Sequence, residues 1–175
     1  MKIYMRKIKK SILTIIVVLA CSCSGIFEEK LSMKRVNYDG NELRTDGYYY
    51  YLNNGNVSTQ VRFLYKNGVG LCANSYASHD LNSVEHEMVM YYPNTIKRKE
   101  NWGLFMISGS TIEIEEWTIE IPRRVTVAKS MGYIENDTTF RLTEHYFSGI
   151  KYTYSERWHF KQFDNKPDST NNFIK

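Results

Sequence analysis

The chain has little of what defines several common protein classes. Its 175 residues include only three cysteines and three prolines. A secreted scaffold held by disulfides uses far more cysteines, so we expect a hydrophobic core to hold this fold. The long apolar run near the start, Ile12 to Leu19, is much shorter than the roughly 18 to 20 residues that cross a bilayer as a helix. A permanent transmembrane helix is therefore not expected.

The first residues follow the order of a bacterial secretory signal peptide. Basic residues come first, the apolar run follows, and the segment ends in small residues and cysteines, Ala20-Cys21-Ser22-Cys23-Ser24. Within it, Val18-Leu19-Ala20-Cys21 resembles a lipobox, in which a small residue precedes the cysteine that becomes the lipidated N-terminus. We therefore predict lipidation at Cys21, with Cys23 as the alternative.

A lipidated N-terminus makes the membrane one expected partner. The residue that follows either cysteine is a serine, Ser22 or Ser24. By resemblance to other lipoproteins, an aspartate at that position would indicate retention in the inner membrane, and it is missing here. We therefore expect a palmitate-bearing lipoprotein that is anchored in the outer membrane of the cell envelope.

Removal of the signal peptide changes the net charge of the protein. Five of the 23 Lys and Arg residues, and none of the 19 Asp and Glu residues, lie in residues 1–20. The mature chain keeps 18 basic against 19 acidic residues, a net charge of −1. The basic clusters Lys97-Arg98-Lys99 and Arg123-Arg124 are short and fit solvated loops or strand ends better than a phosphate site. A nucleic-acid partner is not expected.

The pattern of the mature chain predicts one folded domain with loose ends. About 150 residues is the length of a single domain. Residues 24–41 lack helical or strand periodicity, and the polar segment after Phe163 is broken by Pro167. We expect a signal peptide at residues 1–20 and a lipidated tether at residues 21–41. A β-barrel domain should follow at residues 42–163, and a flexible tail at residues 164–175.

Most of the domain alternates between apolar and polar residues, as strands do. Asn and Gly residues separate these segments, and Asn-Gly between apolar runs is a strong hairpin signal because both residues accept positive φ. Turns are expected at Asn53 to Asn56, Lys66 to Gly68, Ser108 to Ser110, Asn136-Asp137 and Ser148-Gly149. The expected strands are Tyr48–Leu52, Val61–Tyr65, Val69–Cys72, Trp102–Ile107, Ile112–Ile121, Val125–Ile134, Phe140–Phe147 and Tyr152–Phe163.

Two segments depart from simple alternation. From Ser78 to Tyr92 apolar residues recur three and four apart, which predicts one amphipathic helix capped by Ser78 or Asp80 and stopped by Pro93. In the fifth strand the apolar positions change from even to odd numbers between Ile114 and Trp117. An extra residue would restore a single buried face, so we predict a β-bulge near Glu115-Glu116.

About eight consecutive antiparallel strands and one helix predict a mainly β fold, an antiparallel barrel, because closure removes exposed edges. The chain resembles the lipocalin-like small barrels of Bacteroidota envelope lipoproteins. The resemblance is carried by segments 43–50, 61–68 and 101–112, which include Gly47-Tyr48-Tyr49, Lys66-Asn67-Gly68 and Asn101-Trp102-Gly103. The Gly-x-Trp signature of the first lipocalin strand is missing. Eight strands enclose an interior that side chains can fill or that holds one small ligand.

No pattern predicts catalysis or a metal site. His86-Glu87 begins like a zinc-protease helix, but Met90 stands where the second histidine is needed. Cys72 has no neighbour that would lower its pKa, and we expect a small buried residue there. Four carboxylates of the fifth strand, Glu113, Glu115, Glu116 and Glu120, fit a solvated face better than a glycosidase pair. The remaining candidates for a metal or catalytic site are His79 with Asp80, and His145 and His159, which are isolated in strands. We therefore expect no enzyme, no cofactor and no metal.

The aromatic content is the remaining feature: 14 Tyr, 8 Phe and 3 Trp. Tyrosines fit core packing, but they also form binding surfaces at low entropic cost. We name Tyr48, Tyr50, Trp102 and Trp158 as candidate ligand-binding residues near the barrel mouth. The leading hypothesis is a non-enzymatic envelope lipoprotein whose barrel binds a small apolar ligand or a protein partner. The alternative is an interaction or inhibitor protein with a filled barrel that acts through its outer aromatic surface.

Overall fold

The computed structural model describes residues 29–53, 58–120 and 124–175. The predicted signal peptide, both candidate lipidation sites Cys21 and Cys23, and most of the first predicted turn lie outside these residues. Within the described ranges, no helix has the length and apolarity that a membrane crossing requires.

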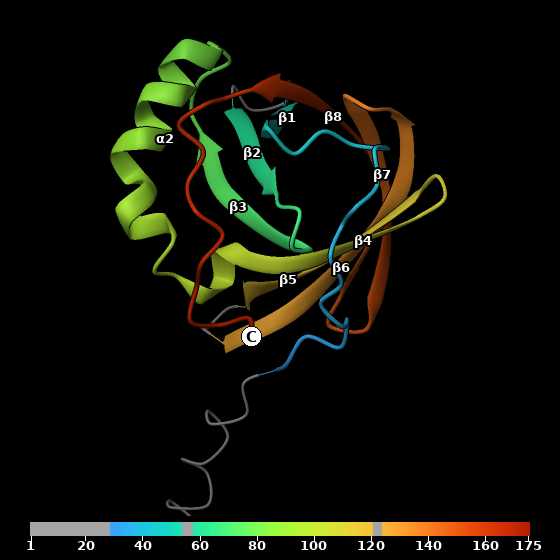
Figure 1. Cartoon of the computed structure of the whole chain (residues 1–175). Coiled ribbons are helices and arrows are strands. Elements are labelled where there is room, and N and C mark those ends of the chain that lie inside the picture. Colours follow the sequence, from blue (N-terminus) through green and yellow to red (C-terminus); the bar gives the residue numbers. More distant parts are fainter. Residues whose placement is uncertain (1–28, 54–57, 121–123) are drawn as a thin grey trace, which may run out of the picture.

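Eight antiparallel strands form a closed barrel in which each strand pairs with its neighbours in sequence and the first pairs with the last (Figure 1). This confirms the predicted fold. The strands are β1 (Gly47–Asn53), β2 (Ser58–Leu64), β3 (Val69–Tyr76), β4 (Trp102–Ser108), β5 (Thr111–Glu120), β6 (Arg124–Asn136), β7 (Thr139–Phe147) and β8 (Ile150–Gln162).

Short turns with left-handed backbone fix several hairpins. Gly68 between β2 and β3 has φ of 78°, and Gly109 between β4 and β5 has φ of 60°. Between β7 and β8 both central residues are left-handed, Ser148 at φ 50° and Gly149 at 77°. This pair of positive φ values matches the right-handed twist of hairpin strands, which is why the Ser-Gly dipeptide marks the turn.

Side chains fill one half of the barrel. We call this inner cluster the barrel core: it consists of Tyr38, Leu43, Tyr49, Leu64, Phe105, Ile112, Ile114, Phe140, Leu142 and Trp158. The rings of Phe140 and Trp158 are stacked, with centroids 5.9 Å apart and planes 6° apart. Offset stacking of this kind adds to the burial of apolar area. The barrel core thus packs this half of the interior with apolar side chains.

Helix α2 (Leu81–Thr95) lies against the outside of the barrel, and the short 3-10 helix η2 (Lys99–Asn101) leads into β4 (Figure 1). The Asp80 carboxylate caps α2 by accepting hydrogen bonds from the backbone N–H groups of Asn82 and Ser83. Of the two caps that the sequence predicted, Ser78 and Asp80, the second is therefore confirmed. The helix continues two residues beyond Pro93, whereas the sequence predicted that it stops there. A proline this close to the end removes only one hydrogen bond of the last turn.

A second cluster lies between the helix and the outer barrel wall. This outer core consists of buried side chains of β1 to β5, of the turn after β2, of α2 and of the C-terminal segment: Tyr48, Val61, Phe63, Tyr65, Val69, Leu71, Ala73, Tyr76, Val84, Met88, Tyr92, Trp102, Leu104, Trp117 and Ile174. Successive residues of a strand point to opposite faces. The strands under α2 are therefore buried on both faces, which explains the near-continuous apolar residues of Val61 to Tyr65.

The predicted bulge near Glu115-Glu116 is wrong. β5 pairs with β4 and β6 in continuous register across these residues. Ile112 and Ile114 face the barrel core, whereas Trp117 on the other face belongs to the outer core. The apolar parity changes because the buried side of the strand changes along its length. Glu115 is also buried, with Ser32 Oγ and the Met33 backbone N–H donating to its carboxylate at 2.6 Å each.

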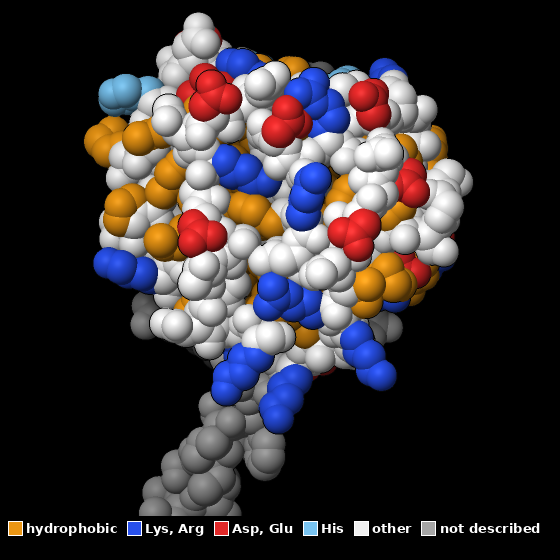
Figure 2. All heavy atoms as spheres, viewed as in Figure 1, with side chains coloured by type: hydrophobic (Ala, Val, Ile, Leu, Met, Phe, Trp, Pro, Cys, Tyr) orange, Lys and Arg blue, Asp and Glu red, His pale blue; other side chains and the backbone are white. Residues whose placement is uncertain are grey.

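Both ends of the described chain pack on the barrel, which differs from the expected tether and tail. Tyr38 is buried in the barrel core, and its backbone N–H donates to the Lys66 carbonyl at 2.6 Å. Near the C-terminus Ile174 is buried in the outer core, and Lys166 Nζ donates to the Thr45 and Leu64 carbonyls. Figure 1 shows the N-terminal segment crossing the barrel end that faces the viewer, and the C-terminal segment running down beside α2. Figure 2 shows acidic and basic side chains interspersed over this same face.

Candidate functional site

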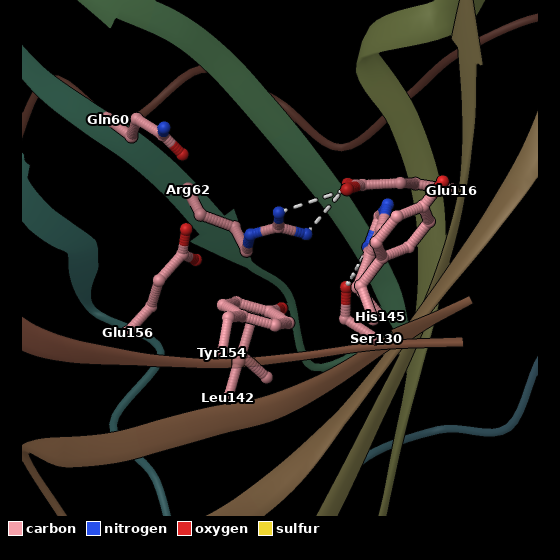
Figure 3. Close-up of a pocket in the computed structure, with 9 residues that line it drawn as sticks. Gln60, Arg62, Glu116, Ser130, Leu142, His145, Tyr154 and Glu156 are labelled. Atoms are coloured by element: carbon pink, nitrogen blue, oxygen red, sulfur yellow. Dashed lines mark hydrogen bonds and ion pairs between the residues drawn. The ribbon is translucent and has the colours of Figure 1, made fainter. Parts of the chain in front are cut away.

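The half of the barrel not filled by the barrel core contains a cavity of about 370 Å³. Its lining comes from five strands, β2, β5, β6, β7 and β8, and all but one of the lining side chains carry a polar group. These residues are Gln60, Arg62, Glu116, Ser130, Leu142, His145, Tyr152, Tyr154 and Glu156 (Figure 3). The volume lies in the range of small-molecule sites, about 300 to 1,000 Å³.

A buried ion pair crosses the cavity. Arg62 of β2 donates from both terminal nitrogens to the Glu116 carboxylate of β5, at 2.7 and 3.1 Å (Figure 3). The side chains are only 7% and 19% exposed. Burial alone would lower the pKa of Arg62, but the Glu116 carboxylate outweighs this effect, and the pKa lies above its ordinary value. The guanidinium is therefore permanently charged and fixed in place.

One donor of Arg62 remains unused. Its Nε is buried and has no hydrogen-bond partner. The guanidinium carbon lies 5.2 Å from the centroid of the Trp158 ring. Trp158 of the barrel core therefore makes a cation–π contact with the guanidinium. Figure 3 shows that Nε lies on the side of the guanidinium away from Glu116. A buried polar group without a partner is costly, so an acceptor supplied from the cavity would stabilise this arrangement.

The inner face of β8 contributes a row of three polar side chains, Tyr152, Tyr154 and Glu156. They are two residues apart, which places them on the same face of the strand. Burial raises the pKa of Glu156, and the positive charge of Arg62 partly opposes this effect. Burial also raises the pKa of Tyr154 to about 12, so its hydroxyl stays protonated at neutral pH.

His145 of β7 completes the opposite wall and pairs with Ser130 of β6, whose Oγ lies 3.1 Å from His145 Nδ1 (Figure 3). Burial lowers the pKa of His145; the Glu116 carboxylate opposes this effect and Arg62 adds to it, and the net shift is downward, which favours the neutral ring at pH 7. Its ring centroid lies 6.3 Å from Tyr152 and 6.1 Å from Tyr154. The three rings form an aromatic wall beside the carboxylates.

The pair of Ser130 and His145 resembles two members of a serine-hydrolase triad. A serine hydrolase needs a third group that orients the histidine. Among the residues that the structure describes, no carboxylate hydrogen-bonds the ring of His145, and no group of three His, Cys, Asp or Glu side chains is placed to hold a metal ion. What the lining does provide is fixed charges, hydrogen-bonding groups and aromatic faces around a cavity that opens to solvent.

The structure does not bring the four predicted ligand-binding residues together. Tyr48 and Trp102 are fully buried in the outer core, where the Tyr48 hydroxyl donates to Glu85 of α2 at 2.9 Å. Tyr50 is half-buried beside Tyr48, with ring centroids 6.2 Å apart. Trp158 lies in the barrel core, under Arg62. Of the four, Trp158 is the one in contact with a residue that lines the cavity.

Sequence reasoning missed the cavity because its residues carry no local signal. Arg62 and Glu116 are 54 positions apart in the chain, and only barrel closure brings them within bonding distance. Glu115 and Glu116 were predicted to be solvated, yet both are largely buried, one under the N-terminal segment and one inside the barrel. An arginine within an otherwise apolar strand was the available clue.

Comparisons with known proteins give no match to a family model, to a curated protein or to a solved structure.

Proposed function

We propose that this chain is a non-enzymatic envelope lipoprotein whose β-barrel binds a small molecule in the cavity around Arg62. The observation that carries the proposal is the unpartnered Nε of Arg62, a buried charged donor in the lining of a cavity of about 370 Å³. Buried arginines normally have their donors satisfied. A buried charged donor without a partner, on a residue that lines a cavity of ligand size, supports a binding role.

The lining favours a polar ligand over the apolar ligand that the sequence predicted. Eight of the nine lining residues have side chains that donate or accept hydrogen bonds, and Leu142 is the exception. An apolar guest would displace water from the Arg62–Glu116 pair and from Glu156 without replacing its hydrogen bonds, which is unfavourable.

The alternative function, through an outer aromatic surface, has weaker support. The large exposed aromatic side chains of the described residues are Tyr91, Tyr133 and Tyr152. They belong to α2, β6 and β8 respectively, and Tyr152 lines the cavity and not the outer wall. The cavity, by contrast, collects polar side chains from five strands in one place.

Native mass spectrometry of the full-length protein, released from its own membranes with detergent, tests the proposal. The wild-type protein should retain an extra mass that unfolding removes. Gln60→Trp places a large side chain in the cavity lining and should abolish that mass. Thr153→Trp, an exposed position on the opposite face of β8, should retain it. The proposal would be contradicted if the wild-type protein carried no extra mass and the two variants gave identical results in a small-molecule binding screen.

The anchor is tested separately by labelling cells with radioactive palmitate. The wild-type protein should be labelled and should fractionate with the outer membrane. Cys21→Ser should abolish the labelling, whereas Cys23→Ser should leave it intact. Labelling that is lost only with Cys23→Ser assigns the alternative site, and an unlabelled, freely soluble wild-type protein contradicts the anchor altogether.

A further inference from the structure

The charges around the cavity do not balance. Arg62 is the one cation in the lining, and Glu116 engages both of its terminal nitrogens. Glu156 is a second carboxylate of the same lining, and no ion pair among the described residues includes it. His145 adds no charge at neutral pH because burial lowers its pKa. Burial raises the pKa of Glu156 and so disfavours its charged form. When Glu156 is ionised, the cavity has one negative charge in excess, and a bound cation would favour that state.

The groups beside Glu156 favour a positive charge. Tyr154 and Tyr152 precede it on the same inner face of β8, and their rings lie near that of His145, at 6.1 and 6.3 Å between centroids. Aromatic faces attract cations through the negative potential above the ring, most strongly where water is excluded. A carboxylate beside a tyrosine ring, here that of Tyr154, is the kind of environment that binds an organic ammonium group.

The unused donor of Arg62 adds a second requirement. Nε has no acceptor in the protein, although the side chain is more than nine-tenths buried. A ligand with an oxygen atom can supply that acceptor. A carboxylate ligand would bring a negative charge between Glu116 and Glu156, which Coulomb repulsion disfavours. A neutral hydroxyl or carbonyl oxygen meets the requirement without this repulsion.

We infer that the ligand is a small amine whose ammonium group pairs with Glu156 beside Tyr154, and whose neutral oxygen accepts from Arg62 Nε. This inference rests on the proposed function and specifies its ligand class, an amino alcohol or a similar amine with a nearby oxygen. The bound ligand would bring the charge of the cavity to zero. It would also satisfy the buried donor, so the two requirements are met by one molecule.

Three probes of nearly the same shape separate the possibilities. Phenylalaninol carries an ammonium and a hydroxyl group. Its diol analogue has a hydroxyl in place of the ammonium. Phenyllactate also has a hydroxyl in place of the ammonium, and it has a carboxylate in place of the CH2OH group. Each probe is titrated into the full-length protein in detergent micelles, and dissociation constants are read from NMR shifts of the cavity residues. We expect phenylalaninol to bind about tenfold more tightly than the diol, and phenyllactate to bind most weakly.

Two charge-neutralising variants assign the effect. Glu156→Gln should remove most of the preference for phenylalaninol over the diol. Glu113→Gln removes the same charge from the outer face of β5, where Glu113 pairs with Lys129, and should keep the preference. Gln60→Trp should abolish binding of all three probes.

The outcomes distinguish the ligand class from the binding function. If phenyllactate or the diol binds best and Gln60→Trp removes that binding, the cavity is a binding site but the inference about its ligand is overturned. The same holds if Glu156→Gln leaves the preference for phenylalaninol unchanged. If no probe shifts the cavity resonances, both the inference and the binding role are contradicted.

Discussion

Arg62 and Glu116 show how closure of the barrel makes a buried charge tolerable. Taking a guanidinium and a carboxylate out of water costs several kcal/mol each, and their mutual attraction offsets this only with good hydrogen-bond geometry. The pair has that geometry, with two donors on two carboxylate oxygens. Such a pair adds little net stability compared with apolar residues, so its presence fits a binding role better than a structural one.

Breaking this pair from one side should be costly. Arg62→Met keeps the volume of the side chain but leaves the Glu116 carboxylate, which is 19% exposed, without its partner. We expect a loss of about 3 kcal/mol in the free energy of unfolding. The double variant Arg62→Met/Glu116→Gln removes both charges and should recover most of the loss. Urea denaturation of the single and double variants measures this, and a double variant no more stable than Arg62→Met would contradict the argument.

For single elements, the sequence predicts where a strand or helix lies along the chain better than it predicts which of its faces is buried. All eight strands and α2 lie within a few residues of their predicted ranges, because alternation, helical spacing and turn residues act locally. Which face of a strand is buried depends on distant segments. β5 shows this: Ile114 faces the barrel core and Trp117 the outer core, and the chain needs no bulge to achieve it. The cavity was unpredictable for the same reason.

Helix α2 depends on one apolar face for its position. Val84 and Met88 are fully buried against the barrel wall, whereas Met90 on the other side is 56% exposed. Met88→Ala should lower the free energy of unfolding by about 3 kcal/mol, since it removes a buried side chain and leaves a cavity. Met90→Ala is the matched control and should change it by less than about 0.5 kcal/mol. Equal effects of the two substitutions in urea denaturation would show that the helix is not held by this face.

For the whole molecule, the two ends of the barrel have different roles. One end is closed by the N-terminal segment around Tyr38 and by the C-terminal segment around Lys166, next to the barrel core. The cavity lies in the other half, among the residues around Arg62 and Glu156. A rigid closed end allows the open half to hold polar groups that contribute little to stability. Neither terminal segment showed a periodic pattern, so their packing could not be read from the sequence.

Lys166 provides a test of the closed end. Its ammonium donates to the Thr45 and Leu64 carbonyls at 2.6 Å each and lies 4.0 Å from the centroid of the Tyr65 ring. Burial lowers the pKa of Lys166 to about 8, whereas an unfolded lysine titrates near 10.4. Between these values the unfolded state binds more protons than the folded state, so the stability of the wild-type protein gains from this group as the pH rises.

Lys166→Met should remove that gain. The difference in unfolding free energy between the wild type and Lys166→Met should shift in favour of the wild type between about pH 7.5 and pH 9.5, because only the wild type has the titrating group. Buried tyrosines titrate in both proteins and cancel in the difference. Urea denaturation at several pH values gives the two curves. Parallel curves across this range would mean that Lys166 is not desolvated in the folded state, and that the C-terminal segment does not close the barrel end as described.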